Sequence, residues 1–139
     1  PAERREHGFV NACRERGVEP QVVKFVFEEY RLQNAEESLK RLLEENPEAD
    51  GIFASDDILA VELLRTCMKT GIAVPDQMKI VGFDGTDITI LSPVSITTIR
   101  QPIKEMAERA ISYISQMVDH KQVPVRTILP VELLVRETT

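Results

Sequence analysis

Three aspartates lie where a carboxylate could bind a ligand, directly after short apolar segments that are typical of buried strands. Asp56 and Asp57 follow residues 51–54, and Asp84 follows residues 78–83. In an open sheet of parallel strands, ligands bind beyond the carboxyl ends of the strands. An ionised carboxylate accepts hydrogen bonds but donates none, and it is also a good ligand for Mg²⁺. These residues could therefore receive the hydroxyl groups of a small ligand or hold a divalent cation.

Each of these aspartates also has a structural interpretation. Asp56 or Asp57 could cap the helix that is predicted to follow, and Asp84 could be a turn residue before Gly85. We expect one residue of the pair to be the helix cap. A turn requires no particular residue at position 84, so the structural interpretation is weaker there.

Arg5 and Tyr30 are two further candidates for ligand binding. Arg5 lies in the first turn of a predicted helix, where the helix dipole favours anions, so its position hints at another use as a donor to a hydroxyl or carboxylate. The alternative is a solvated surface arginine beside Arg4. Tyr30 follows a predicted strand and could stack on the face of a sugar or simply cover the core.

The elements around these residues alternate between helix and strand. Hydrophobic periodicity and capping residues predict helices over 2–16, about 34–46, 57–70 and 103–119, strands over 22–27, 51–54 and 78–83, and extended segments over 97–99, 125–129 and 131–136. Residues 84–96 are predicted to form a loop. Short apolar strands joined by amphipathic helices predict an α/β fold, a doubly wound parallel sheet with helices on both faces.

Composition excludes several classes of protein. The chain has 139 residues, of which 42% are hydrophobic, and a net charge of −6, which is ordinary for one globular domain or a large piece of one. The acidic charge and the lack of a basic cluster argue against nucleic-acid binding by these residues. No segment approaches the ~20 apolar residues of a membrane helix, and residues 1–5 do not begin a signal peptide.

The two cysteines and the first helix add weaker expectations. Cys13 and Cys67 fall on apolar helix faces, so we expect free, buried thiols in a reducing, cytoplasmic compartment, with a single disulfide as the alternative. The chain opens on a helix without the strand that should feed it in a βαβ unit. We therefore expect a first strand, and more of the protein, upstream of Pro1.

Six short motifs in order resemble those of one protein family. They are Arg5–Phe9 (R-x-x-G-F), Phe53–Ala60 (F-A-S-N-D-x-x-A), Gly71–Asp76 (G-I-x-V-P-x-D), Ile80–Asp84 (V-V-G-F-D), Thr97–Pro102 (T-T-I-x-Q-P) and Leu129–Thr138 (L-P-x-x-L-x-x-R-x-S/T). Together they span essentially the whole chain and resemble the effector-binding domain of the lactose/galactose repressor (LacI/GalR) family of bacterial transcriptional regulators. Each motif is weak by itself, but the six in this order are highly specific.

The resemblance implies a periplasmic-binding-protein-like fold of type I, in which two subdomains clamp an effector. Residues 1–97 and 131–139 would form the C-terminal subdomain. Residues 98–130 would cross to the N-terminal subdomain, which is otherwise absent from this chain, and return. The apolar face of the helix over 103–119 would then pack on that subdomain.

The resemblance also assigns binding residues. Arg5 matches the family's ligand-contacting arginine, Asp84 matches its sugar-binding aspartate, and Asp56 takes the place of its usual asparagine. Tyr30 matches an aromatic residue that often stacks on the ligand, and Gln101 is a candidate on the hinge side. The apolar residues Ile88, Ile90 and Leu91 are predicted to contribute to a dimer interface, with a loop folded over the core as the alternative.

The expected function is that of an effector sensor, not an enzyme, with no cofactor and no metal. Its partners would be a sugar or sugar derivative, a second copy of the chain, and operator DNA only through a helix-turn-helix domain outside this chain, with no membrane. A solute-binding protein of ABC transport is the alternative. A Mg²⁺-dependent phosphoreceptor is disfavoured because the acidic pair comes late in the chain and no lysine follows the strand before Asp84 at the required place.

Overall fold

The structure, a computed structural model, describes residues 2–24, 27–28, 31–32 and 35–139 and contains one four-stranded sheet. Its strands are β3 (Gly51–Phe53), β4 (Lys79–Asp84), β5 (Thr97–Arg100) and β6 (Glu132–Leu134), in that spatial order. β3, β4 and β5 are parallel, and β6 is antiparallel to β5. The carboxyl ends of the three parallel strands therefore meet at one edge of the sheet.

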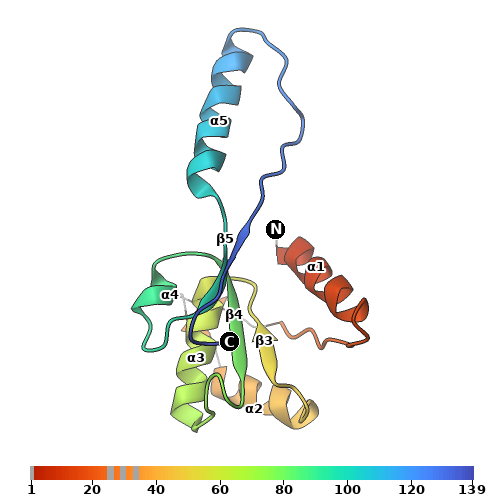
Figure 1. Cartoon of the computed structure of the whole chain (residues 1–139), viewed down its shortest axis with the longest axis vertical. Helices are drawn as coiled ribbons and strands as arrows, with labels where there is room; N and C mark the ends of the chain where they lie inside the picture. Colours follow the sequence, from red (N-terminus) through yellow and green to blue (C-terminus); the bar gives the residue numbers. More distant parts are fainter. Residues whose placement is uncertain (1, 25–26, 29–30, 33–34) are drawn as a thin grey trace.

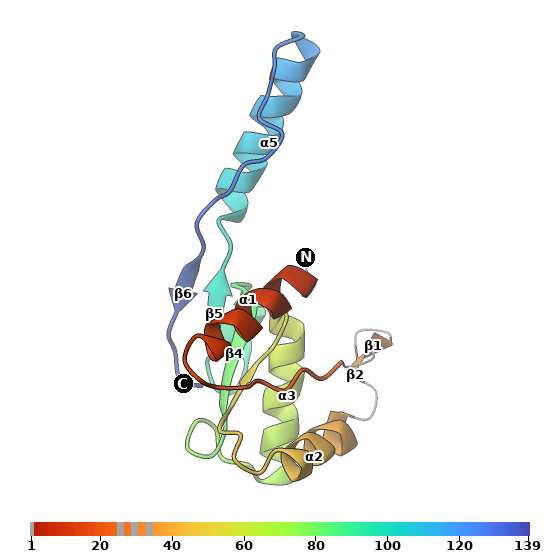
Figure 2. The same ribbon diagram turned by 90° about the vertical axis from the view of Figure 1, so that its right-hand side faces the viewer.

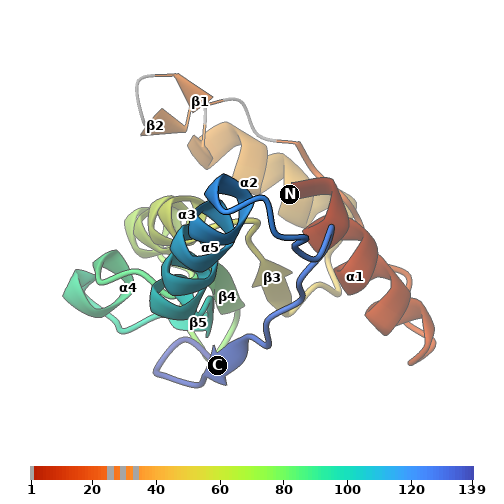
Figure 3. The ribbon, with the colours of Figure 1, turned by 90° about the horizontal axis from the view of Figure 1, so that it is seen from above.

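Helices lie on both faces of this sheet, as the sequence predicts. They are α1 (Ala2–Arg14), α2 (Ala35–Glu45), α3 (Asp57–Thr70), the single turn α4 (Ile88–Leu91) and α5 (Ile103–Val118). Alternate residues of a strand point to opposite faces, so Ile80 of β4 faces α3 while Phe83 faces α1. Figure 3 shows α1 and α3 on opposite sides of the strands. In the part of the chain that the structure describes, no helix is long and apolar enough to span a bilayer.

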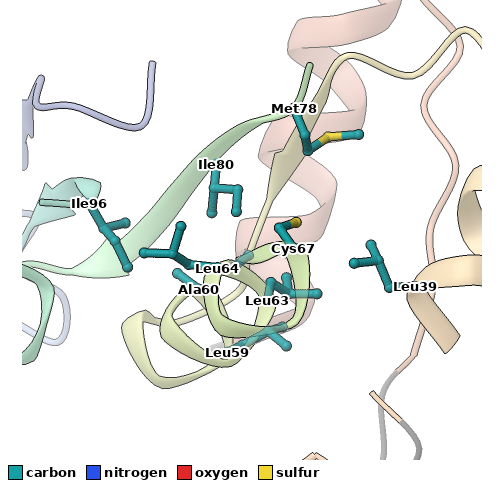
Figure 4. Close-up of a cluster of buried hydrophobic side chains, with 10 residues drawn as sticks. Leu39, Leu59, Ala60, Leu63, Leu64, Cys67, Met78, Ile80 and Ile96 are labelled. Atoms are coloured by element: carbon teal, nitrogen blue, oxygen red, sulfur yellow. The ribbon is translucent and has the colours of Figure 1, made fainter. Parts of the chain in front are cut away.

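The core lies between α3 and the sheet. Its buried side chains are Leu39, Ala54, Leu59, Ala60, Leu63, Leu64, Cys67, Met78, Ile80 and Ile96 (Figure 4). Five of them lie on α3, at the spacing that places residues on one face of a helix. Asp56 caps the start of α3, and Gly71 ends it in the left-handed conformation with φ of 77°. These caps confirm the predicted helix over 57–70.

The helix α5 and the returning chain form an arm that leaves the body of the molecule. Figures 1 and 2 show α5 rising beyond β5, with the chain running back beside it to β6. No residue of α5 is buried, and apolar side chains such as Ile111 and Ile114 are more than 60% exposed. The inward apolar face that the sequence predicts therefore has no cover among the described residues. Packing on an absent subdomain remains a prediction.

One predicted strand is wrong over part of its length, and one predicted extended segment has no strand pairing. Residues 22–24 of the predicted strand over 22–27 are not in a strand, and residues 25–26 lie outside the described residues. Phe27 lies in β1 (Phe27–Glu28), which pairs with β2 (Arg31–Leu32). Residues 125–129 are also without strand structure. In both segments, β-branched residues indicate a tendency to extend, but a strand also needs a partner with which to exchange hydrogen bonds. The predicted loop over 84–96 contains the short helix α4.

Both cysteines are free, and their different burial leads to a prediction. Burial raises the pKa of the Cys67 thiol, so at neutral pH less of it is the reactive thiolate. We expect a thiol-specific alkylating reagent to modify the partly buried Cys13 first, and Cys67 only after unfolding in guanidinium chloride. Mass spectrometry of the two cysteine-containing peptides measures both rates. Equal rates in the native protein would contradict this buried environment.

Candidate functional site

The carboxyl edge of the sheet brings together residues from four segments of the chain. Ser55 and Asp56 follow β3, Asp84 ends β4, and Gln101 follows β5. The pairing of Asp84 with Arg100 places Gln101 directly beside the end of β4. Helix α1 contributes Arg5 from the face of the sheet opposite α3. Four of the five predicted binding residues therefore belong to one edge, and Tyr30 lies outside the described residues.

Arg5 joins α1 to this edge. Its Nη1 donates to the carbonyl oxygen of Ser55 at 2.6 Å, and its Nη2 donates to Oδ1 of Asp84 at 3.0 Å. The guanidinium lies 4.0 Å from the centre of the Phe83 ring, a favourable cation–π contact. The Arg5 and Asp84 side chains are 20% and 29% exposed, so the pair is held by the protein and still reachable. The alternative of a fully solvated Arg5 is excluded.

Aromatic packing fixes the helix that carries Arg5. The rings of Phe9 and Phe53 are stacked with centroids 5.1 Å apart, and Phe53 meets Phe83 edge-on at 6.5 Å. Contacts of this kind stabilise a particular ring geometry beyond simple burial. The aromatic contacts therefore hold α1 against β3 and β4, with Arg5 over the end of the sheet.

Gln101 makes two contacts with Asp84. Its Nε2 donates to Oδ1 of Asp84 at 2.7 Å, and its backbone N–H donates to the carbonyl oxygen of Asp84 at 3.2 Å. Arg5 uses the same carboxylate oxygen. Within the described residues, no hydrogen bond involves Oδ2 of Asp84. That oxygen can accept a hydrogen bond from a ligand without displacing either internal donor.

The backbone at Asp84 is strained, and its surroundings hold it in place. Asp84 has φ of 123°, a conformation that costs a non-glycine residue roughly 1–3 kcal/mol and that is concentrated at functional sites. Gly85 follows with φ of 76°, and a Cβ there would lie 2.6 Å from Cα of Arg100. A glycine is therefore needed beside the carboxylate because β5 approaches it closely.

Asp56 has the cap role that the sequence offers as an alternative, and it also lies at the carboxyl edge of the sheet. Its Oδ1 accepts from the backbone N–H of Leu59 at 2.8 Å, and its Oδ2 accepts from the Ser55 hydroxyl at 3.2 Å. The residue is partly exposed and lines the same cavity as Arg5. Helix capping uses one carboxylate oxygen, so a role in binding through the other is compatible with it.

Asp57 has a structural role. It is 1% exposed, and its two oxygens accept from the Thr86 N–H at 2.7 Å, the Thr86 hydroxyl at 2.8 Å and the Thr98 hydroxyl at 2.5 Å. A Cβ at Gly82 would lie 2.6 Å from Asp57 Oδ1, so glycine makes room for the carboxylate. Because Asp57 already serves these donors, the aspartates do not form a shared ligand set for Mg²⁺. Among the described residues, no three His, Cys, Asp or Glu are grouped to hold a metal ion.

Sequence reasoning missed two contributions to the site, the Ser55 carbonyl and the Phe83 ring. The carbonyl leaves no signal in residue types. The ring does leave one, because Phe83 directly precedes Asp84 in an apolar strand.

A cavity of about 890 Å³ extends from Arg5 and Asp56 along β3 toward the segment over 18–24, and most of its lining lies away from the polar edge.

The three apolar residues predicted at a dimer interface lie on α4. Ile88, Ile90 and Leu91 are 40%, 56% and 82% exposed, so the alternative of a loop folded over the core is wrong for these side chains. Their role in an interface remains a prediction.

Comparison with known proteins gives one consistent set of relatives. The family model described as periplasmic binding protein-like domain matches residues 1–139. The ribose operon repressor of Halalkalibacterium halodurans is 34% identical over 100% of this chain and 41% of its own length. The sucrose operon repressor of Streptococcus mutans is 37% identical over 70% of this chain and 31% of its own length.

Solved structures are similar over nearly the whole chain. A periplasmic binding protein/LacI transcriptional regulator from Alkaliphilus metalliredigens, complexed with D-xylulofuranose, has 31% identity and a TM-score of 0.83 over 99% of this chain and 51% of that one. The regulator CelR in complex with cellobiose has 26% identity and a TM-score of 0.81 over 97% of this chain and 42% of that one. The chain therefore spans less than half the length of the curated relatives and about half that of the solved structures.

Proposed function

Because the chain belongs to the periplasmic binding protein-like family of LacI-type regulators, we propose that it is the part of a bacterial transcriptional repressor that binds a sugar effector. The observation that carries the proposal is the carboxylate of Asp84, which Arg5 and Gln101 hold at the sheet edge with one oxygen available for a ligand. Relatives named as sugar-operon repressors and as sugar complexes support it.

The site is suited to recognising hydroxyl groups. Oδ2 of Asp84 and the carboxylate of Asp56 would accept hydrogen bonds from the ligand, and the face of Phe83 lies under the guanidinium of Arg5. Binding of this kind needs no covalent step. The relatives are named as repressors and regulators, which favours a sensor over an enzyme and over a transport receptor.

The proposal includes a division into two subdomains, which the arm supports. Residues 1–97 and 131–139 would form one half of the clamp, and residues 98–130 would extend into the other half. The exposed apolar face of α5 supports this division, because a second subdomain would cover it. Gln101 lies where the chain leaves β5 for α5 and donates to Asp84. A change at Asp84 on ligand binding would therefore be transmitted to the segment over 98–130, which crosses between the subdomains. Regulation requires that the effector bind one arrangement of the subdomains better than the other.

A homodimer is part of the proposal, and Leu91→Asp tests it. Leu91 is 82% exposed on α4, and a charge at the centre of an apolar interface opposes association. We expect Leu91→Asp to shift the intact protein from dimer to monomer in sedimentation velocity. Val18→Asp, at a residue 56% exposed beyond α1, is the matched control and should leave the mass unchanged. An unchanged mass for Leu91→Asp would remove α4 from the interface.

Titration of the intact protein with sugars tests the function itself. D-ribose, D-xylulose and sucrose are the first probes because the relatives suggest pentoses and a disaccharide. We expect one of them to raise the thermal unfolding midpoint with saturation and to change the affinity for operator DNA. A midpoint that no sugar shifts would contradict the proposal.

A further inference from the structure

The positive charge of the Arg5 guanidinium is already neutralised within the protein. Both terminal nitrogens of Arg5 donate internally, one to the Ser55 carbonyl and one to Asp84. A ligand anion could take the guanidinium only by displacing Asp84, which would leave a half-buried carboxylate without its counterion. The site therefore presents carboxylate acceptors to a ligand more readily than it presents a positive charge.

The place on this edge that would suit an anion is filled by Asp56. The start of a long helix presents backbone N–H groups and a positive dipole end, which favour phosphate and carboxylate groups. At the start of α3, Oδ1 of Asp56 takes the Leu59 N–H, and Asp57 adds a second carboxylate in the first turn. The helix N-terminus therefore already binds the chain's own carboxylate.

The remaining cations near Asp84 are paired as well. Beside Asp84 and Gln101, an open hollow is lined by three basic residues. Arg100 pairs with Glu132, Lys104 with Glu108, and Arg109 with Glu105. At the edge itself lie the three carboxylates of Asp56, Asp57 and Asp84, and of these Asp84 pairs with Arg5. The local balance of charge is thus negative.

We propose that Asp56 is a specificity residue that makes this site select neutral, hydroxyl-rich sugars and reject their phosphorylated derivatives. The inference rests on the proposed function and deepens it. The carboxylate repels a phosphate while its Oδ2 accepts a sugar hydroxyl. Because Asn is as good a helix cap as Asp, Asp56→Asn removes the charge and keeps the cap, which separates specificity from stability.

Calorimetric titration of the intact protein with three matched pairs tests the proposal. The pairs are D-ribose and its 5-phosphate, D-xylulose and its 5-phosphate, and sucrose and its 6-phosphate. The wild type should prefer the neutral member of the pair that binds. In Asp56→Asn that preference should fall by about tenfold, the change expected for one unit charge a few ångströms away at a partly exposed site. Asp76→Asn makes the same charge change at an exposed residue before β4, at the other end of the sheet, and should keep the preference.

The outcomes separate the two proposals. A wild type that binds the phosphorylated sugar as well as the neutral one, or an Asp56→Asn protein with unchanged preference, overturns the inference and leaves the proposed function standing. If no member of any pair binds, both fail. Should Asp56→Asn not fold, the wild type still tests the inference. Added salt must then lower the ratio of its affinities for the neutral and the phosphorylated sugar, because screening weakens the repulsion. A ratio that does not change with salt overturns the inference.

Discussion

Replacing Asp57 by alanine is expected to lower the free energy of unfolding by about 3 kcal/mol, the largest stability change at this edge. The carboxylate is 1% exposed and accepts three hydrogen bonds from Thr86 and Thr98. Its removal would leave these donors without their acceptor. It would also separate the start of α3 from the segments after β4 and at β5, because the same carboxylate joins them.

Urea unfolding of the intact protein, followed by circular dichroism, measures this loss. The matched control is Asp50→Ala, because the Asp50 side chain is 86% exposed and pairs with Lys79 at 3.6 Å, and such surface pairs contribute about 1 kcal/mol or less. The same midpoint for both variants would show that Asp57 does not join the elements of the sheet edge.

Replacing Asp84 by alanine is expected to weaken effector binding about 100-fold. A hydrogen bond to a charged group contributes about 1.5–3 kcal/mol, and Asp84 also holds Arg5 and Gln101 in place. Without the carboxylate, the ligand loses its acceptor and the two donors lose their common partner. The folded state should persist, because the side chain is 29% exposed and lies outside the core.

Calorimetric titration of the intact protein with the sugar that binds measures the effect. Asp87→Ala removes an exposed aspartate three residues further on and should leave the affinity unchanged. Arg5→Ala should weaken binding as well, and Asp84→Ala combined with Arg5→Ala should cost less than the sum of the two, because the residues act as a pair. Full affinity in Asp84→Ala would remove this residue from the site.

The elements that could be predicted from sequence are those whose ends and faces are both encoded locally. Helix α3 has a cap residue at each end, Asp56 and Gly71, and a regular apolar face between them. The strands before Asp56 and Asp84 are short apolar runs, and the polar residues at their ends predicted that these side chains meet at one edge of the sheet. Val22 and Val23 are apolar as well, but residues 22–24 pair with no strand in the part of the chain that the structure describes, and pairing is a property of the whole fold.

The division of roles between neighbouring aspartates could not be predicted. Asp56 and Asp57 are adjacent and chemically identical, and only the packed structure buries one and leaves the other at the edge. The contact of Arg5 with Phe83 is equally hidden, since the two residues are far apart in sequence and meet only when α1 packs on the sheet. Spacing therefore indicated the edge, and tertiary contacts assigned the role of each side chain.

A crystal structure of the intact protein grown with the sugar that binds tests the central claim most directly. We expect a sugar hydroxyl about 2.5–3.0 Å from Oδ2 of Asp84, with Arg5 still over the ring of Phe83. A sugar bound elsewhere, for example only in the apolar cavity along β3, with Asp84 contacting nothing but Arg5 and Gln101, would contradict it.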